Sequence, residues 1–276
     1  MTGLGRQPDP GRQPRVPILM YHEIAARPET ASRRAVPPAA FAAQLAYLHD
    51  AGFSTVTFAD AAAALAGETG RLPARPVVLT FDDGFADFHR EALPLLRRYG
   101  FTATVFVTTG WIADAGAYKA GRRPGQMLCW NQIREAAGAG VEIGAHSHGH
   151  PQLDQIAPGQ LRNELAVSKA LLEDGIGLPV LSLAYPFGYS SAGVRRTARA
   201  SGYRHACAVA NATARPGGDG YTLPRLTVRA STSPASFEHI VRGHDSKIYL
   251  KDHALTKGFA MIRRSRAVLA GISRRA

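Results

Sequence analysis

The sequence predicts an α/β fold in which a parallel sheet closes into a barrel. Short, apolar, β-branched runs alternate with longer segments of helical periodicity. Glycines stand where several helices should end, just before the next strand, as at Gly52, Gly100 and Gly202. The chain has 276 residues, of which 45% are hydrophobic and 20% charged. This length and composition favour one large globular domain.

The expected strands are short runs of mostly apolar residues, at 18–22, 55–58, 77–81, 103–108, 141–145, 181–185 and 206–210. The helices expected between them cover residues 39–51, 59–66, 88–99, 130–139, 159–175 and 191–201. Repeated βα units of this kind imply a parallel sheet. In a barrel built from such units, chemistry collects at the carboxyl ends of the strands.

The two ends of the chain differ from the barrel, which is expected to cover residues 16–245. Residues 1–15 are rich in proline, glycine and charge, so we expect a disordered segment. Residues 246–276 form a basic tail with Leu255, Phe259, Ile262 and Leu269 at helical spacing. An amphipathic helix here could lie on an anionic membrane surface, or it could pack its apolar stripe on the barrel.

The chain is basic, with 33 lysines and arginines against 21 acidic residues and a net charge of +12. This charge favours anionic partners. The basic residues are scattered, without the interleaved aromatic residues that stack on bases, so we expect no nucleic acid. Cys129 and Cys207 form no CxxC pair and are expected to be reduced, in or near the core.

The location is expected to be cytoplasmic, with peripheral contact at the inner membrane face through the tail. The first 15 residues contain no apolar core of a secretory signal. No stretch reaches the roughly 18 uninterrupted apolar residues that a membrane span requires.

Two adjacent carboxylates, Asp82 and Asp83, follow the strand expected at residues 77–81. They should therefore lie at the catalytic edge of the barrel. Two acids held close together repel each other unless a cation or a proton lies between them. A plain turn is the alternative, because Asp-Gly often ends a strand.

Three histidines, His146, His148 and His150, follow the strand expected at residues 141–145. His146 and His150 are four residues apart, so in a helical turn their imidazoles would lie on one side and could share a metal ion. A solvated turn is the alternative, and the spacing alone does not choose among the three. One carboxylate with two imidazoles leaves coordination positions open for water and substrate. A second carboxylate beside them could be a general base, which indicates metal-assisted hydrolysis of an amide or ester.

Three segments resemble the signature motifs of the polysaccharide deacetylases, the NodB-type enzymes of carbohydrate esterase family 4. They are Phe-Asp-Asp-Gly at 81–84, His-Ser-His-Gly-His at 146–150 and Tyr-Pro-Phe-Gly at 185–188. The resemblance runs from about residue 16 to 230 and implies a distorted (β/α)7-type barrel. It implies that Asp82 is the base and that Asp83, His146 and His150 bind one divalent metal ion, usually zinc and sometimes nickel or cobalt. His148 then falls at a variable position.

The third motif departs from the family pattern, because Ala184 stands where an arginine usually positions the base. Arg225 is our candidate for that missing arginine, and a surface arginine is the alternative. The motif keeps Phe187, whose backbone N–H could face the developing oxyanion, and Tyr185, which we expect beside it at the substrate.

The late Leu-x-His motif, whose histidine protonates the leaving amine, is missing after residue 210. His22 ends the first expected strand, and its placement resembles a subgroup that deacetylates poly-N-acetylglucosamine and carries these motifs in circularly permuted order. We therefore expect His22 to be the general acid. The alternative is a histidine that packs at a strand end.

The expected function is removal of N-acetyl groups from an N-acetylated sugar or polysaccharide, which yields acetate and a free amine. The basic charge suits a phosphate- or lipid-linked substrate. Hydrolysis of another small amide or of an O-acetyl ester is one alternative. A catalytically silent glycan-binding barrel is another, and the intact Asp82 argues against it.

Overall fold

A computed structural model describes residues 15–26 and 34–243 of the chain. Almost all of the expected N-terminal segment and the whole basic tail lie outside the described residues. No helix of the described ranges is long and apolar enough to cross a membrane. The cytoplasmic location and the membrane contact through the tail stay predictions.

A single parallel sheet of eight strands forms the centre of the described part of the chain. Its order is β7-β6-β5-β4-β3-β1-β8, and the short β2 pairs with β3 on the side. The strands are β1 Ile18–Tyr21, β2 Ser54–Thr55, β3 Pro76–Phe81, β4 Thr104–Val107, β5 Glu142–Ala145, β6 Ser182–Ala184, β7 His205–Cys207 and β8 Leu226–Thr227. The predicted α/β barrel is confirmed, and all seven expected strands are present.

The barrel is distorted where its two end strands meet. β7 does not form a ladder with β8; instead, the segment that leads into β8 bonds to β7 and its continuation. Leu223 N donates to Ala206 O over 3.1 Å, and Ala208 N donates to Leu223 O over 3.0 Å. This irregular seam brings Arg225 inside the barrel, where it is fully buried.

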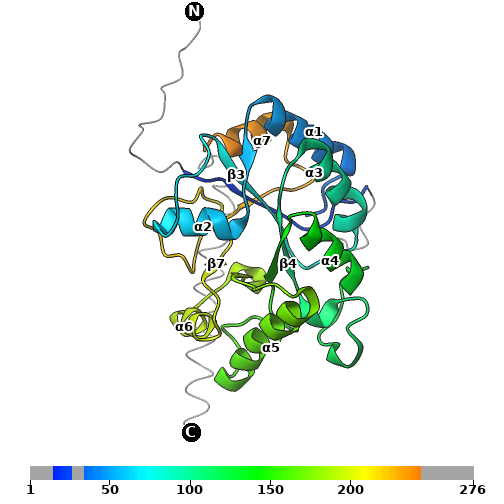
Figure 1. The fold of residues 1–276 in the computed structure, drawn as a ribbon, viewed down its shortest axis with the longest axis vertical. Helices are drawn as coiled ribbons and strands as arrows, with labels where there is room; N and C mark the ends of the chain where they lie inside the picture. Colours follow the sequence, from blue (N-terminus) through cyan, green and yellow to red (C-terminus); the bar gives the residue numbers. More distant parts are fainter. Residues whose placement is uncertain (1–14, 27–33, 244–276) are drawn as a thin grey trace, which may run out of the picture.

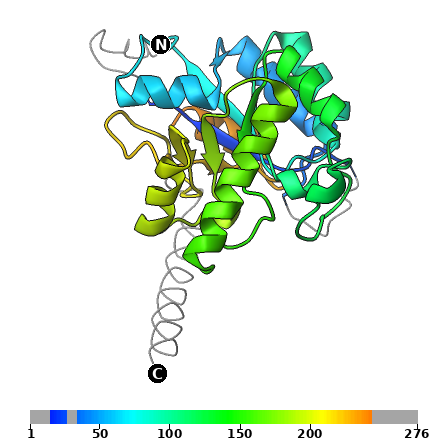
Figure 2. The ribbon, with the colours of Figure 1, turned by 60° about the horizontal axis from the view of Figure 1, so that its bottom comes forward.

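Helices cover the outside of the curled sheet (Figure 1). They are α1 Pro38–Asp50, α2 Phe58–Ala66, α3 Leu93–Tyr99, α4 Trp130–Gly138, α5 Pro158–Ile176, α6 Ala192–Ala200 and α7 Pro234–Val241. The long α5 crosses in front of the strands in the turned view (Figure 2). All six expected helices are present, and the sequence did not predict α7 or β8.

The helix expected at residues 88–99 is divided in two. Its first part, Phe88–Ala92, is a π-helical turn, and Leu93 N donates to Phe88 O five residues earlier. Pro94 follows at the start of α3 and has no N–H for an intrahelical bond. A wider turn before a proline is a regular way for a helix to absorb that loss.

The core is packed by aromatic side chains beneath the carboxyl ends of β1 and β3. Tyr21 stacks on Phe81 with ring centroids 5.2 Å apart, and Phe41 of α1 meets both rings edge-on. Tyr21 also donates to Gln44 Oε1 over 2.9 Å. This packing fixes the ends of the two strands from which His22 and Asp82 follow. Both cysteines are free, with Cys207 buried and Cys129 partly buried.

Candidate active site

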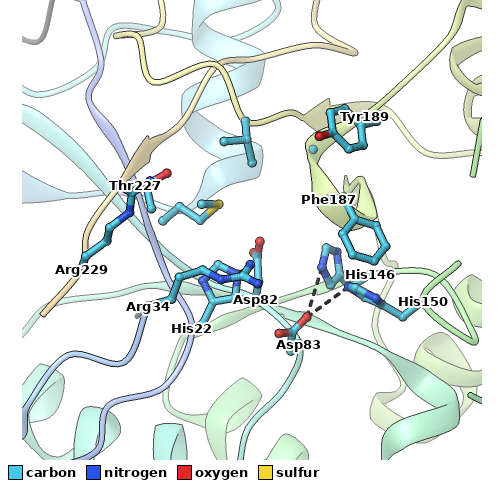
Figure 3. A pocket seen from close by; sticks show the side chains of 13 residues that line it. His22, Arg34, Asp82, Asp83, His146, His150, Phe187, Tyr189, Thr227 and Arg229 are labelled. Atoms are coloured by element: carbon cyan, nitrogen blue, oxygen red, sulfur yellow. Dashed lines mark hydrogen bonds and ion pairs between the residues drawn. The ribbon is translucent and has the colours of Figure 1, made fainter. Parts of the chain in front are cut away.

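The two adjacent acids leave β3 in different directions. Asp82 continues the strand, because its N–H donates to Tyr21 O over 3.0 Å. Asp83 then takes a left-handed backbone conformation with φ of 75°, and Gly84 follows with φ of 86°. This turn separates the two carboxylates, so that they face different partners (Figure 3).

Asp82 faces Arg225, which is completely buried. The guanidinium binds the carboxylate in a bidentate pair, with Nη1 2.5 Å from Oδ1 and Nη2 2.7 Å from Oδ2. Burial, the largest single cause, would raise the pKa of Asp82, but the charge and hydrogen bonds of Arg225 together with the nearby His146 and His22 outweigh it, and the pKa lies below its ordinary value. The structure therefore places our candidate arginine where it can fix and ionise the expected base.

Asp83 faces two imidazoles. His146 Nε2 lies 3.4 Å and His150 Nε2 lies 3.3 Å from its Oδ1. His146 Nδ1 lies 2.8 Å from the carbonyl oxygen of Ala184. Because a carbonyl only accepts, Nδ1 carries a proton and donates it to this oxygen, so Nε2 is the nitrogen that faces Asp83 and can coordinate a metal ion. A second-sphere bond of this kind is typical of histidines that bind metal ions.

These three side chains fit a divalent metal ion. Asp83, His146 and His150 each offer one ligand atom, and these atoms lie within 4.8 Å of one another. Burial would raise the pKa of Asp83, yet hydrogen bonds from the two histidines hold it well below its ordinary value. One carboxylate and two imidazoles are a donor set that suits zinc and leaves further coordination positions for water and substrate.

Residues 146–150 do not form a helical turn. The segment is an irregular loop in which Ser147 and His150 have φ of 62° and 61°. This loop turns His148 away, so that its Nδ1 lies 2.9 Å from Thr109 Oγ1. The structure thus brings His146 and His150 together by strained backbone rather than by helical periodicity.

His22 follows β1 and lies beside the two acids, 6% exposed. Its Nε2 is 2.9 Å from Nη1 of Arg34. A guanidinium can only donate, so this nitrogen accepts and the imidazole is neutral. Burial, as the largest cause, lowers the pKa of His22 to about 4. His22 Nδ1 is buried and has no hydrogen-bond partner within the described part of the chain.

Of the two residues expected from the third motif, at 185–188, only Phe187 places its side chain at the site. Phe187, with φ of 61° and 47% exposed, lies against the His150 ring at 4.9 Å. Tyr185 is fully buried in the core, and its hydroxyl has no hydrogen-bond partner among the residues described. The Tyr185 side chain therefore lies in the core, and a role of Tyr185 at the substrate stays a prediction.

A pocket of about 480 Å³ unites these groups. One side carries Arg34, Arg229 and Thr227, and the opposite side carries Phe187 and Tyr189 (Figure 3). Its lining residues are Met20, His22, Arg34, Asp82, Asp83, His146, His150, Phe187, Gly188, Tyr189, Val209, Thr227 and Arg229. The sequence analysis missed Arg34 and Arg229. Arg229 lies two residues after the end of β8, a strand that was not predicted, and Arg34 lies in a loop without a local signal.

Comparison with known proteins agrees with this geometry. Residues 69–206, half of the chain, match the model of the family described as polysaccharide deacetylase. The chain belongs to the polysaccharide deacetylase family. The match includes the Asp82 and His146 segments but not His22 or Arg225, which lie outside it in sequence and join it only in the fold.

Three relatives of this deacetylase illustrate the likeness. YxkH of Bacillus subtilis, provisionally named a polysaccharide deacetylase, is 29% identical over 81% of this chain and 75% of its own length. The Streptococcus pyogenes deacetylase PplD, solved with acetate, superposes with a TM-score of 0.74 at 26% identity, over 83% of this chain and 99% of that one. A Staphylococcus aureus poly-β-1,6-N-acetyl-D-glucosamine N-deacetylase is 22% identical over 64% of this chain and 61% of its own.

The buried pair predicts a pH-dependent loss of stability when Arg225 is replaced. Arg225→Leu leaves the Asp82 charge buried without its partner and should lower the free energy of unfolding by about 3–5 kcal/mol at pH 7. The pKa of Asp82 is depressed in the folded protein, so the pair stabilises it above the ordinary carboxyl pKa of about 4. This stabilisation is lost as the pH falls through the folded-state pKa, so the two proteins should converge in acid.

Urea unfolding at pH 7 and at several lower pH values measures this difference. Arg196→Leu, which removes an exposed arginine of α6, is the control and should change stability by no more than about 0.5 kcal/mol. Equal losses in the two variants at pH 7 would contradict the role given to Arg225.

Proposed function

We propose that the protein is a metal-dependent hydrolase that removes N-acetyl groups from an N-acetylated sugar or polysaccharide, releasing acetate and a free amine. The observation that carries this proposal is the separation of two adjacent carboxylates. Asp83 faces two histidines, whereas Asp82 faces a buried arginine, and both line one pocket. A site with one carboxylate for a metal ion and one kept as a base is suited to hydrolysis of an acetamide.

Asp83, His146 and His150 are the proposed ligands of one divalent metal ion, with zinc the first choice and nickel or cobalt as alternatives. When bound, this ion supplies Lewis acidity: it lowers the pKa of a water molecule and polarises the acetamide carbonyl. Hydrogen bonding of His146 to Ala184 keeps the correct nitrogen available.

Asp82 is the proposed general base. Its depressed pKa keeps it ionised over the neutral range, and the bidentate contact with Arg225 holds its plane fixed. The carboxylate accepts the proton of the attacking water. Phe187 lines the pocket with a left-handed backbone conformation, and its N–H is proposed to stabilise the oxyanion.

His22 is the proposed general acid for the departing amine. It is neutral in the free protein, so it must gain a proton before it can donate one. The charges of Asp83 and Asp82 favour that uptake, whereas the Arg34 charge opposes it. An anionic group on the substrate that pairs with Arg34 would remove this opposition.

The substrate is proposed to be an N-acetylated saccharide that carries a phosphate link. Arg34 and Arg229 line one side of the pocket, and guanidinium groups bind phosphate well. Phe187 and Tyr189 on the other side offer apolar faces to a sugar ring. The Staphylococcus aureus relative, by its name, acts on a polymer of N-acetylglucosamine.

Acetate release and metal content test the proposal together. Asp82→Asn should retain metal but lower kcat about 10²- to 10⁴-fold, because the base is lost while the ligands remain. His146→Ala should lose both metal and turnover. His148→Ala is the matched control, because this histidine turns toward Thr109, and it should retain metal.

The substrates are N-acetylglucosamine oligomers, the same sugar with a phosphodiester link, and O-acetylated xylan. Metal is measured by mass spectrometry of the purified proteins. If His146→Ala keeps its metal and its turnover, the proposed site is wrong. Faster release from O-acetylated xylan than from either N-acetylated substrate would favour an esterase instead.

A further inference from the structure

The loop at residues 146–150 carries both proposed histidine ligands but has an unfavourable backbone. Ser147 and His150 take positive φ angles of 62° and 61° without being glycine. Such conformations are energetically unfavourable for residues other than glycine and persist only when neighbouring groups impose them. The distance between the two imidazoles therefore depends on the contacts that neighbouring segments make with this loop.

Helix α5 supplies the contacts on one side of the loop. Glu164 is 8% exposed, and its Oε2 accepts hydrogen bonds from His148 N over 2.9 Å and from Gly149 N over 2.7 Å. Ser168 lies one turn further along the same face and donates from Oγ to Ser147 O over 3.1 Å. Helix α5 therefore makes hydrogen bonds to the backbone of all three residues, 147–149, between the two proposed ligands.

The segment after β4 supplies the contacts on the other side. Gly110 N donates to His148 O over 2.8 Å, and Thr109 N donates to Ser147 O over 3.3 Å. These bonds use the carbonyl oxygens of the loop. The N–H groups of His148 and Gly149 both donate to the carboxylate of Glu164.

The approach of Glu164 to the loop is close. A Cβ added to Gly149 would lie 3.0 Å from Glu164 Oε1, so a larger residue at position 149 would push the carboxylate away. Hydrogen bonds from backbone N–H groups to a carboxylate are about twice as strong as those between neutral groups. Glu164 therefore has the position and the strength to hold the strained loop.

We propose that Glu164 is a positioning residue that sets the geometry of the metal site from helix α5. It contacts neither the proposed ligand atoms nor the pocket, and it acts through the backbone of the loop between them. This inference rests on the proposed metal site. It predicts that Glu164 controls metal affinity, whereas a residue that only anchors α5 on the barrel would alter the stability of the metal-free protein alone.

Metal affinity measured on the full chain distinguishes these two roles. Zn²⁺ dissociation constants come from competition with a chromophoric chelator, and the visible spectrum of bound Co²⁺ reports the ligand geometry. Thermal unfolding of the metal-free proteins reports the fold. The variants are Glu164→Ala, Glu164→Asp, Glu164→Gln and Ser168→Ala. Glu173→Gln is the control, because this glutamate lies on the same helix but binds Lys169 and Val180 N.

Glu164→Ala should weaken Zn²⁺ binding about 10- to 100-fold, as loss of second-sphere partners does in other metal sites. It should also alter the Co²⁺ spectrum. Glu164→Asp keeps the charge but withdraws the carboxylate, so it should weaken binding about 10-fold. Glu164→Gln should recover most of the affinity, because one amide oxygen can accept from both N–H groups. Ser168→Ala should have a smaller effect, and Glu173→Gln should match the wild type.

Wild-type affinity and an unchanged Co²⁺ spectrum in Glu164→Ala would overturn the proposal. If that variant does not fold, Glu164→Asp decides in the same way. Failure of the wild-type protein to bind Zn²⁺ would instead overturn the proposed metal site itself. A wild type that binds Zn²⁺, with Glu164 variants that bind it equally well, would overturn only the role of Glu164.

Discussion

The buried ion pair between Arg225 and Asp82 is the interaction on which the site depends. It joins the residue before β8 to the residue after β3, with β1 between these strands. Either charge alone would be strongly unfavourable in this interior, so the two side chains hold each other in place, and the pair fixes the Asp82 carboxylate. It also binds both oxygens of Asp82, which leaves Asp83 to face the histidines.

The parallel sheet explains why residues far apart in sequence meet here. β1, β3, β5 and β8 end at the same edge, and His22, Asp82, His146 and Arg229 follow those ends. After the strand ends, residues with left-handed backbone turn the chain so that neighbouring side chains face the site. Asp83, Ser147, His150 and Phe187 are four of the five non-glycine residues with positive φ in the described ranges. Strain concentrated at one site is typical of functional geometry.

The sequence predicted what local patterns encode. Periodicity and glycine caps located seven strands and six helices, and the two motifs after β3 and β5 located the acids and histidines. Arg225 was proposed as the arginine beside Asp82 because Ala184 stands where the family usually has that arginine. β8 has two residues and no measurable periodicity, so β8 and the following Arg229 were missed. Strained loop backbone has no sequence period either, so the sequence could not show how the loop at 146–150 brings His146 and His150 together.

The position of a bound metal ion distinguishes the role that we propose for Asp83 from the role that we propose for Asp82. Crystals grown with Zn²⁺ and measured at its absorption edge give an anomalous peak that locates the ion independently of any model. We expect a peak about 2.0–2.2 Å from one oxygen of Asp83 and from Nε2 of both His146 and His150, with Asp82 still paired to Arg225. A peak bound by Asp82, or by His148 in place of either histidine, would contradict it.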